Sequence, residues 1–591
     1  MSKMQTKLDY ADAIADWFLE LGEASSYAGD LEQGINYTYV AATILQRQNR
    51  YLSSARFESN LQFIASNLAE CNSMELVKHI DKNDEREVCL HVMSEAVPAG
   101  GITAMVTRWI RNDPSRIHSL ALFENKSPIP DVIIQAVTNA GGSIYIANQG
   151  DSILQQAAWL RALSNEVARY SILHIGSSDV ICGAAFGKNG GPPVVLVNYT
   201  AHTFWTGATI ADSVLNVRGS ALEELWVAKY RGIQRYATVP IPLDNPDLIT
   251  SHATLPLQLK HQAKVALGLE KDSIVILTVG SFFKFLPTEG LDFVEACESI
   301  LKQVPEAHLL AVGFDGGGDS RWTNASRRLG GRIKTLGVLS HARLADIHEA
   351  TDVYIEGFPF GTTTSLFEAG IKGIPVVLAP AQCPPPYGSD GVALDDFLER
   401  PCSVDDYKTK TINLCKSAVE RRSQGDELSD VITRHHTVPG WKTYLEDALG
   451  SLPEEHSTYA LVNPSRTPEA IHEYWATFMS KITFGYEETL EIAVSLALAR
   501  GLQPRLTSGV RQACCQFRSV RTHGTIPLPL LIFLCNFLLP MLPISSAHNL
   551  FRFLSFLCRP SLITRLRSKL PPLLGGTEPV RPMYGEYRKA N

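Results

Sequence analysis

The stretch YIEGFPFGTTTSLFEAGIKGIPVVLA, from Tyr354 to Ala379, contains the pattern that decides the fold. An apolar run ends in a turn rich in glycine and hydroxyl residues. A helix-like segment from Ser365 to Lys372 follows, and Gly373 separates it from a second apolar run. Strand, turn, helix and strand in this order predict one unit of a parallel sheet. The hydroxyl groups of residues 362–365 are therefore expected at a helix N-terminus.

Apolar runs of this kind recur along the chain of 591 residues. The first series is VCLHVM, HSLALF, SIYIAN, YSILHIGSSDVI and PPVVLVNY, and the second is SIVILTVGS, AHLLAVGF, IKTLGVL, DVYIEGF and IPVVLA. Helix-like segments separate the runs, and the proline-rich residues 238–248 lie between the two series. We predict an α/β protein with two doubly wound, Rossmann-like domains, which face a cleft formed by the carboxyl ends of their strands.

Four parts of the chain follow from this pattern. We expect a helical cap in residues 1–75, the first α/β domain in 76–250, the second in 251–450 and a helical, basic extension in 451–591. In the cap, apolar residues at helical spacing are interrupted at Gly29 and Asp30 and resemble one tetratricopeptide hairpin. Such repeats need about three copies to bury a continuous core, so one copy predicts a cap.

Composition limits the cellular setting and the partners. Eleven cysteines without a C-x-x-C pair, and no apolar leader, favour a cytoplasmic protein. The chain has a net charge of −7, and we expect no nucleic-acid partner. The part from Gly501 onward is basic, however, with twelve Lys or Arg against two Glu. Prolines interrupt residues 526–546 too often for a membrane-spanning helix. Residues 551–570 mix arginines with apolar side chains, which suits either peripheral membrane contact or a packed helical extension.

The hydroxyl run is the candidate anion site. Free N–H groups and the helix dipole attract phosphate at a helix N-terminus, and hydroxyl groups add donors. Gly361 lets the backbone approach a ligand, and Glu368, one turn into the helix, is expected to bind ribose hydroxyls. Lys284 follows Gly280 and Ser281 at the same sheet edge and is expected to neutralise a leaving diphosphate. The alternative is that one hydroxyl caps the helix and the others form the turn. The run consists of Thr362, Thr363, Thr364 and Ser365.

The segment DVYIEGFPFGTTTSLFEAGIKGIPVV resembles the donor site of GT-B glycosyltransferases, both the group 1 type and the O-GlcNAc transferase-like type. The matching positions are Asp352, Val353, Phe358, Pro359, Thr363, Thr364, Glu368, Ala369, Gly373, Pro375, Val376 and Val377. The resemblance is closest over residues 270–400. It implies the GT-B fold, a nucleotide-sugar donor with UDP as the first expectation, and no metal or other cofactor. It adds Phe360, Ser389 and Asp390 to the donor-binding residues.

Two departures from the family leave the stereochemistry open. Ser281 stands about where group 1 enzymes often have an arginine. Glu356 and Glu368 are twelve residues apart, whereas the paired glutamates of group 1 enzymes are eight apart. The glycine-rich loop GFDGGGDSRW lacks the spacing of a dinucleotide motif, and we interpret it as a loop.

A second segment, VNYTAHTFWTGATIADSVLNVR, resembles a pattern in the first domain of bacterial GT-B proteins. His202 is expected to accept the acceptor proton or bind donor phosphate, unless it is an ordinary loop histidine. Trp205 is expected to stack on a sugar or to fill the core. Asp212 is a second candidate base, or an ion-pair partner of Arg218 on a common helix. The matching positions are Asn198, His202, Phe204, Trp205, Gly207, Ala211, Asp212, Val214 and Arg218.

The resemblance thus predicts a hexosyl- or N-acetylhexosaminyl-transferase. Its partners would be a nucleotide sugar and a protein, lipid-linked or polysaccharide acceptor, and Lys284 would be catalytic together with His202 or Asp212. The first domain would hold the acceptor and the second the donor. Two alternatives stay open at this point: a sugar-nucleotide epimerase of the same fold, and a non-catalytic scaffold with a degenerate core.

Overall fold

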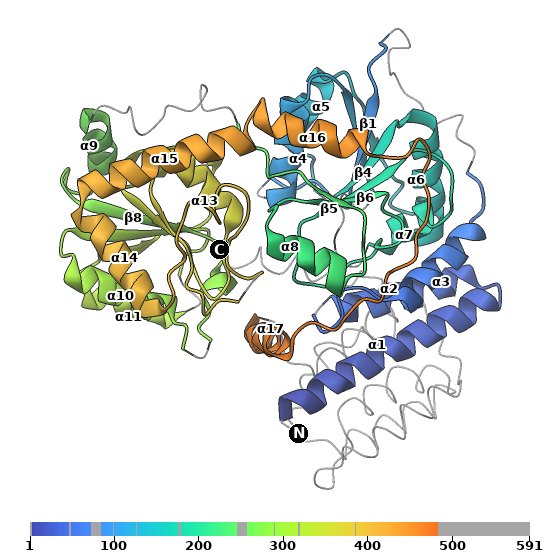
Figure 1. The fold of residues 1–591 in the computed structure, drawn as a ribbon, viewed down its shortest axis with the longest axis horizontal. Coiled ribbons are helices and arrows are strands. Elements are labelled where there is room, and N and C mark those ends of the chain that lie inside the picture. Colours follow the sequence, from blue (N-terminus) through green and yellow to red (C-terminus); the bar gives the residue numbers. More distant parts are fainter. Residues whose placement is uncertain are drawn as a thin grey trace, which may run out of the picture.

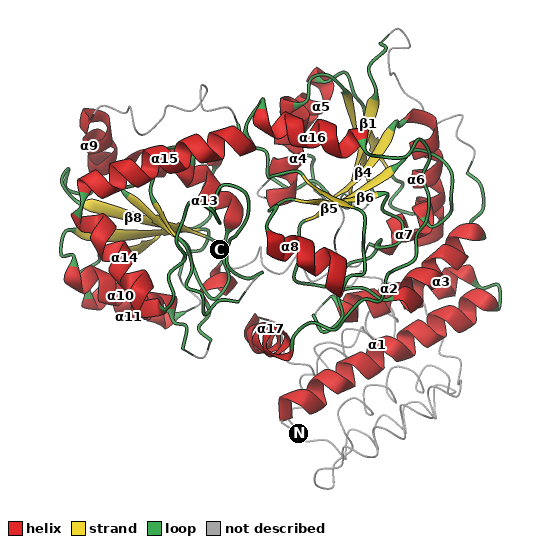
Figure 2. Ribbon diagram, viewed as in Figure 1, coloured by secondary structure: helices red, strands yellow, loops and turns green. Residues whose placement is uncertain are grey.

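Each series of apolar runs forms one parallel sheet. The computed structural model describes residues 3–482, except 47–48, 72–83, 99, 124, 126, 175, 177–178, 245–256, 289, 317–318 and 385. Figure 1 shows the two sheets side by side, and Figure 2 shows helices on both faces of each. Every strand pair is parallel, which confirms the expected class of two doubly wound α/β domains.

The first sheet has seven strands in the order β3-β2-β1-β4-β5-β6-β7. The strands are β1 Val88–Met93, β2 Ile117–Leu122, β3 Ile144–Ile146, β4 Tyr170–His174, β5 Val194–Asn198, β6 Ser213–Asn216 and β7 Tyr236–Thr238. The helices are α4 Gly101–Asn112, α5 Asp131–Asn139, α6 Ile153–Val167, α7 Val180–Phe186 and α8 Ala221–Leu225, with a π-helix at Trp226–Tyr230.

Strand β6 corrects one expectation. Asp212 and Arg218 were placed on a common helix, but β6 lies between them, so they flank opposite ends of a strand. All four residues of β6 are buried. A short strand buried on both faces shows no alternation of polar and apolar residues, so its sequence does not distinguish it from part of a helix.

The second sheet has five strands in the order β10-β9-β8-β11-β12. The strands are β8 Ile274–Val279, β9 Ala307–Val312, β10 Ile333–Thr335, β11 Val353–Ile355 and β12 Val376–Val377. The helices are α9 Leu257–Ala266, α10 Phe293–Gln303, α11 Ser320–Arg328, α12 His341–Ala350 and α13 Thr363–Gly370, with a 3-10 helix, η5, at Phe282–Phe285. Strands β8 and β11 are neighbours, so the turns that follow them lie at one edge.

The chain then crosses back to the first domain. Helices α14 Val404–Lys416 and α15 Ala418–His436 cover the second sheet, and α16 Gly440–Gly450 lies against the first (Figure 1). The indole Nε1 of Trp441 donates to the Pro240 carbonyl at 2.8 Å, and Arg116 Nη1 lies 3.0 Å from Glu446 Oε1. Helix α16, which we expected in the second domain, therefore contacts the first, and the predicted domain bounds stay a prediction. Residues 456–467 form backbone hydrogen bonds with the first domain and the cap before helix α17, Glu469–Ile482.

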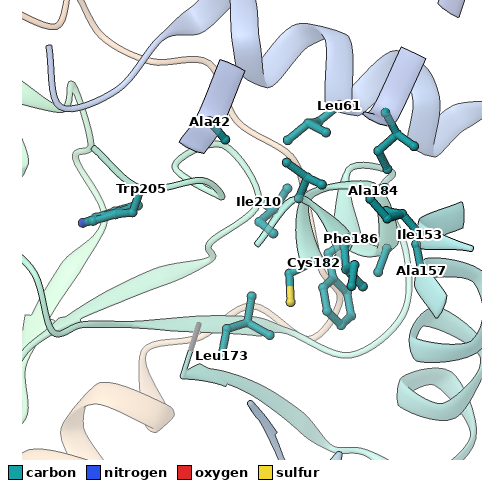
Figure 3. Packing of buried hydrophobic residues seen from close by; sticks show 14 of the residues in the cluster. Ala42, Leu61, Ile153, Ala157, Leu173, Cys182, Ala184, Phe186, Trp205 and Ile210 are labelled. Atoms are coloured by element: carbon teal, nitrogen blue, oxygen red, sulfur yellow. The ribbon is translucent and has the colours of Figure 1, made fainter. Parts of the chain in front are cut away.

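The cap consists of α1 Lys3–Tyr27, α2 Leu31–Leu45 and α3 Ala55–Ser66. Gly29 has a φ of +85°, and Asp30 caps α2, which matches the predicted break between the first two helices. The buried carboxylate of Glu58 on α3 accepts the N–H of Gly207 at 2.9 Å. Figure 3 shows Leu61 of the cap packed in the core of the first domain, so the cap and this domain share one hydrophobic cluster.

Several predictions for the C-terminal extension lie outside the described residues. These are the basic region from 501, the proline-interrupted residues 526–546 and the membrane or packing role of 551–570. Within the part of the chain that the structure describes, no helix is both long and apolar enough to cross a membrane.

Candidate active site

The candidate site is built around the turn between β11 and α13. Gly361 lies so close to the side chain of Glu356 that an added Cβ would stand 1.9 Å from Glu356 Oε1. Its N–H donates to the Tyr387 carbonyl at 2.7 Å. Glu356 is fully buried, and its two carboxylate oxygens accept the N–H groups of Ala379 and Ser389, each at 2.8 Å. This buried carboxylate therefore joins the turn to the two segments that follow it, and only glycine fits at position 361.

The N-terminus of α13 has no side-chain cap. Thr362 occupies the cap position, but its hydroxyl donates to the Val279 carbonyl at 2.8 Å and lies 3.1 Å from the Tyr354 hydroxyl. Among the described residues, no acceptor is found for the N–H groups of the first three helical residues, 363–365. The alternative reading of the hydroxyl run, one cap and three turn formers, is thus not what the structure has. The N-terminus therefore keeps donors of the kind that a helix N-terminus offers to an anion, and anion binding stays a prediction.

The other hydroxyl groups of the run differ in their contacts. Thr363 Oγ1 lies 2.9 Å from Ser389 Oγ, which is buried. The hydroxyls of Thr364 and Ser365 are partly exposed, and no hydrogen-bond partner for them is present among residues that the structure describes. These two hydroxyls are therefore available to a ligand at the helix N-terminus.

Lys284 reaches this turn from η5. Its ammonium group donates to the Gly361 carbonyl at 2.8 Å and lies 4.8 Å from the centre of the Phe360 ring. Burial, together with the nearby Arg218, lowers the pKa of Lys284 to about 8. The sequence placed this lysine correctly because β8 and β11 are adjacent. Gly280 is equally close to the turn, since an added Cβ would stand 3.2 Å from Thr362 Cγ2. Ser281 is exposed, and its carbonyl accepts the Lys284 N–H at 2.9 Å.

Two arginines of the first domain pair with acidic residues of the predicted donor set. Arg218 Nη1 lies 2.8 Å from Asp390 Oδ1 and also donates to the Gly388 carbonyl at 3.1 Å. The hydroxyl of Ser220 donates to the other oxygen of Asp390 at 2.7 Å. Asp390 is therefore already engaged within the protein.

Glu368 is engaged in the same way. Arg108 on α4 forms an ion pair with it, and the side chains of both residues are mostly buried, with exposed fractions of 11% and 18%. Arg108 also lies 3.5 Å from Asp244. Glu368 therefore contacts the other domain in this structure. To bind ribose hydroxyls, its carboxylate would have to accept their hydrogen bonds in addition to those from Arg108, or break the ion pair.

His202 lies against aromatic rings at the boundary between the domains. Its ring centre is 5.0 Å from that of Phe360, 5.8 Å from Tyr387 and 5.0 Å from Trp475. Burial, with Arg218 and Lys284 nearby, lowers its pKa well below the usual value, so the imidazole is neutral and its surroundings oppose protonation. The loop that contains it is held by Arg231, whose guanidinium donates to the carbonyls of Thr200, Ala201 and Thr203.

Helix α17 adds an aromatic layer that the sequence did not indicate. Trp475 stacks on Tyr387 with ring centres 5.7 Å apart and an angle of 7°, and Phe478 stacks on Phe360 at 5.5 Å and 17°. The Tyr474 hydroxyl donates to the Pro359 carbonyl at 2.6 Å. Figure 1 shows α17 between the two α/β domains. A C-terminal helix thus lies over the turn that carries the candidate anion site.

The structure does not bring Asp212 to this site. Its buried carboxylate accepts the Val194 N–H at 2.7 Å and the Tyr459 hydroxyl at 2.9 Å, and one oxygen lies 2.7 Å from His456 Nδ1. Asp212 thus holds the returning C-terminal segment on the first sheet, and we do not retain it as a base. Trp205 is a core residue: it is 3% exposed, and the Arg231 guanidinium lies 4.0 Å from its ring centre (Figure 3).

The predicted donor residues therefore gather around one turn, together with His202. The residues that sequence reasoning did not assign to the site are Arg108, Arg218, Tyr387 and Trp475. The sequence could have indicated Arg218, because this residue is one of the matching positions in the first-domain pattern quoted above. The glycine-rich loop after β9 packs against Gly280, since an added Cβ at Gly313 would stand 2.4 Å from the Gly280 carbonyl oxygen. Within the described residues, no group of three or more His, Cys, Asp or Glu could hold a metal ion.

Comparisons with known proteins give distant structural likenesses. A scan of protein-family models finds no match, and a search of curated proteins finds none either. Solved structures that resemble the chain include a mutant O-GlcNAc transferase from Thermobaculum terrenum, with 11% identity, a TM-score of 0.42 and coverage of 80% of this chain and 86% of that one. TarM has 12% identity, a TM-score of 0.46 and coverage of 63% and 99%. The lipopolysaccharide outer core galactosyltransferase WaaB has 18% identity, a TM-score of 0.41 and coverage of 61% of this chain and 99% of that one.

The sheet order itself supports the fold that the sequence predicted. Two parallel, doubly wound sheets are followed by a helix pair that returns the chain to the first domain. The chain has the two-domain α/β architecture of the GT-B fold.

Proposed function

We propose that the protein is a glycosyltransferase that uses a nucleoside-diphosphate sugar, with UDP as the first candidate nucleotide. The observation that carries the proposal is the uncapped N-terminus of α13, which has free N–H groups and the hydroxyls of Thr364 and Ser365. Lys284 is bonded to the Gly361 carbonyl in the turn just before this helix. A diphosphate is the ligand that fits this combination, because helix N-terminal donors and an ammonium group stabilise the same negative charge.

The same groups would assist the reaction. As the bond between the sugar and the diphosphate breaks, negative charge grows on the departing oxygen. Preorganised donors that face this charge lower the barrier without rearranging. Lys284 is held in place by the Gly361 carbonyl, so its ammonium group is fixed beside the helix N-terminus before the ligand arrives.

The acceptor would enter from the side of the first domain. His202 contacts Phe360 and Trp475, and no hydrogen-bond partner for its ring is found in the described part of the chain. A neutral imidazole in this position is able to bind an acceptor or a donor phosphate. The acceptor classes that we propose are a protein, a lipid-linked glycan and a polysaccharide, and the transferred sugar is a hexose or an N-acetylhexosamine. We propose a reaction without a metal.

The test is a thermal-shift screen of the full chain with UDP, GDP, ADP and CMP. A ligand that binds only the folded state raises the melting temperature by mass action. The informative variant is Ser365→Glu, because a carboxylate in the first turn stabilises a helix and repels a phosphate. Val419→Glu is the matched control: it adds the same charge near the N-terminus of α15, where Val419 is 80% exposed.

We expect one nucleotide to stabilise the wild type and the Val419→Glu protein but not the Ser365→Glu protein. Hydrolysis of the matching sugar nucleotide would then establish bond cleavage. A full shift in Ser365→Glu would show that the nucleotide binds elsewhere. If no nucleotide stabilises the wild type, the non-catalytic scaffold becomes the better explanation.

A further inference from the structure

A continuous row of hydrogen-bonded side chains crosses one face of the first sheet. His118 on β2, His91 on β1 and His174 on β4 are followed by Tyr199, the residue after β5. The nitrogen atoms that join His118 to His91 are 2.9 Å apart, and those that join His91 to His174 are 2.8 Å apart. His174 Nδ1 lies 2.6 Å from the Tyr199 hydroxyl. These four strands are neighbours in the sheet, and the row runs diagonally from the amino end of β2, which we call the inner end, to the carboxyl edge.

With all three rings neutral, the Asp113 end of the row fixes the direction of every hydrogen bond. His118 Nε2 lies 2.8 Å from the backbone carbonyl of Asp113, which can only accept, so Nε2 carries the hydrogen. In a neutral ring, Nδ1 of His118 then accepts, and His91 donates to it from Nε2. The same reasoning makes His174 donate from Nε2 to His91 Nδ1. Tyr199 must therefore donate its hydroxyl hydrogen to His174 Nδ1, and no donor to its oxygen is found among the described residues.

The surroundings of His91 and His174 keep these two rings neutral. His91 and His118 are fully buried, and His174 is nearly so. Burial lowers the pKa of His174 to about 3 and that of His91 well below its usual value. Trp109 of α4 packs edge-on against His91 and His174, with ring centres 5.6 and 5.8 Å away. Trp441 of α16 covers Trp109 at 5.6 Å.

The two ends of the row differ in chemistry. At the inner end, the Asp113 carboxylate lies 3.4 Å from His118 Nε2 and 3.1 Å from Arg116, which also pairs with Glu446 of α16 and lies 3.8 Å from Glu87. Burial raises the pKa of Asp113, but hydrogen bonds from His118 and Ser115 outweigh it and leave that pKa below its ordinary value. A carboxylate that stays ionised beside His118 would stabilise an imidazolium there.

At the outer end, Tyr199 is partly exposed and stands three residues before His202 in the loop at the domain boundary. Three buried imidazoles are costly compared with apolar side chains of the same size. The row has a carboxylate at one end and the hydroxyl of the partly exposed Tyr199 at the other, the two groups that a proton path needs at its ends.

We propose that this row is a proton relay that removes the acceptor's proton during sugar transfer, and this inference rests on the proposed function. The acceptor oxygen forms a bond to the anomeric carbon with its lone pair, and the bond from that carbon to the diphosphate breaks with its electrons on the diphosphate. The acceptor hydrogen moves to the Tyr199 oxygen, and the Tyr199 hydrogen moves to His174 Nδ1. Hydrogens move in turn from His174 Nε2 to His91 Nδ1 and from His91 Nε2 to His118 Nδ1.

The net result is one positive charge on His118, paired with Asp113, and one released nucleoside diphosphate. His91 and His174 exchange one hydrogen for another and end neutral. Burial opposes the charge on His118, which is fully buried, and the ion pair with Asp113 would have to offset this cost. Tyr199 would be the residue that contacts the acceptor, and the histidines would act through it.

The test uses water as the acceptor, since hydrolysis of UDP-glucose or UDP-N-acetylglucosamine loses the same kind of proton. Tyr199→Phe removes the outer hydroxyl, and His91→Phe interrupts the row while keeping a ring of similar size. His435→Phe is the matched control, because His435 Nδ1 lies 2.8 Å from the Tyr444 hydroxyl in a second histidine–tyrosine pair away from the site. General base catalysis is worth roughly 10²–10⁴-fold, so we expect hydrolysis to fall at least about 100-fold in the first two variants. The control is expected to hydrolyse at the wild-type rate.

Three readouts separate the relay from a structural role. UDP binding is expected to stay within about twofold of the wild type in all variants, because Tyr199 and His91 lie outside the anion site. The second readout is the hydrolysis rate in mixtures of light and heavy water, plotted against the deuterium fraction. The plot should be curved for the wild type, because several hydrogens move together. It should be straight for His91→Phe. Nitrogen-15 NMR of the wild type should show the Nε2–H form for all three histidines.

Several results would overturn the relay. They are unchanged hydrolysis in Tyr199→Phe or His91→Phe, an Nδ1–H form at any of the three rings, and a wild type that binds UDP but hydrolyses neither sugar nucleotide. A wild type that binds no nucleotide would instead remove the proposed function on which the relay depends. If His91→Phe does not fold, Tyr199→Phe and the NMR measurement still decide the question.

Discussion

The affinity for a nucleoside diphosphate should fall as the pH rises through the pKa of Lys284. Its pKa of about 8 in the free protein means that about nine tenths of the molecules carry the charge at pH 7 and about one tenth at pH 9. A diphosphate binds the charged form better. Proton uptake therefore favours binding, and alkaline conditions oppose it.

The size of the effect follows from the contact. A hydrogen bond to a charged group contributes about 1.5–3 kcal/mol, which corresponds to roughly a 10- to 150-fold change in Kd. The same coupling raises the pKa of Lys284 in the complex by about one to two units, to about 9–10. We therefore expect the Kd for UDP to rise about tenfold for each pH unit above 8 until the pKa of the complex is reached.

The assay is isothermal titration calorimetry with UDP between pH 7 and 9.5 at constant ionic strength. Lys284→Met should bind roughly 10- to 150-fold more weakly at pH 7, and its Kd should change little with pH. Titration of the ligand's own phosphate affects both proteins equally. Lys302→Met, which changes a lysine that is 62% exposed on α10, should behave as the wild type. A pH-independent Kd in the wild type, or the same slope in Lys284→Met, would refute this role of Lys284.

Three further changes test the framework of the site. Glu356→Gln should destabilise the protein by about 1–3 kcal/mol in urea unfolding, because one of two buried N–H groups would face an amide donor; an unchanged midpoint would contradict the observed contacts. Glu368→Gln should cost about 2 kcal/mol or more by removing the partner of a buried guanidinium, whereas Asp346→Asn, in an exposed pair with Arg343, should cost less than about 1 kcal/mol; equal costs would argue against this contact between the domains. Trp475→Ala should increase hydrogen exchange in α17, since it removes the stacking on Tyr387, and unchanged exchange would show that α17 is held by other contacts.

The sequence predicted the features of the site that depend on local pattern and on neighbouring strands. The turn before α13 follows from an apolar run, Gly361 and four hydroxyl residues. Lys284 meets this turn because the strands before them, β8 and β11, are adjacent and parallel, which places their carboxyl ends together. Neither step needs knowledge of side-chain packing between distant elements.

The rest of the site depends on contacts that no local pattern contains. Arg108 and Glu368 are 260 residues apart, and Arg218 and Asp390 are 172 residues apart. Ion pairs of this kind arise only when two separately folded sheets are placed against each other. A helical extension was expected in residues 451–591, but the position of α17 over the site was missed for the same reason: Trp475 is one apolar residue of a helix until the fold lays it on Tyr387.

Asp212 shows how a residue of suitable chemistry can belong to the framework instead. It stands in the pattern that contains His202, and a carboxylate near a site is a natural candidate base. Its oxygens instead accept from Val194 and Tyr459 and contact His456, and two of these partners come from the returning segment after α16. Those partners are more than 240 residues away in sequence, so no local pattern indicates that the carboxylate is occupied.

The two proposals divide the chemistry between the domains. Groups that would stabilise the leaving diphosphate, Lys284 and the N-terminus of α13, belong to the second domain, and the row that ends at Tyr199 belongs to the first. A reaction that needs both sets of groups depends on how the two domains are placed relative to each other. The ion pair of Arg218 and Asp390 connects the domains, with 2.8 Å between Arg218 Nη1 and Asp390 Oδ1. Removing Arg218, the first-domain member of the pair, should therefore slow sugar transfer by misplacing the two sets of groups. Nucleotide binding should change much less, because the anion site lies wholly within the second domain.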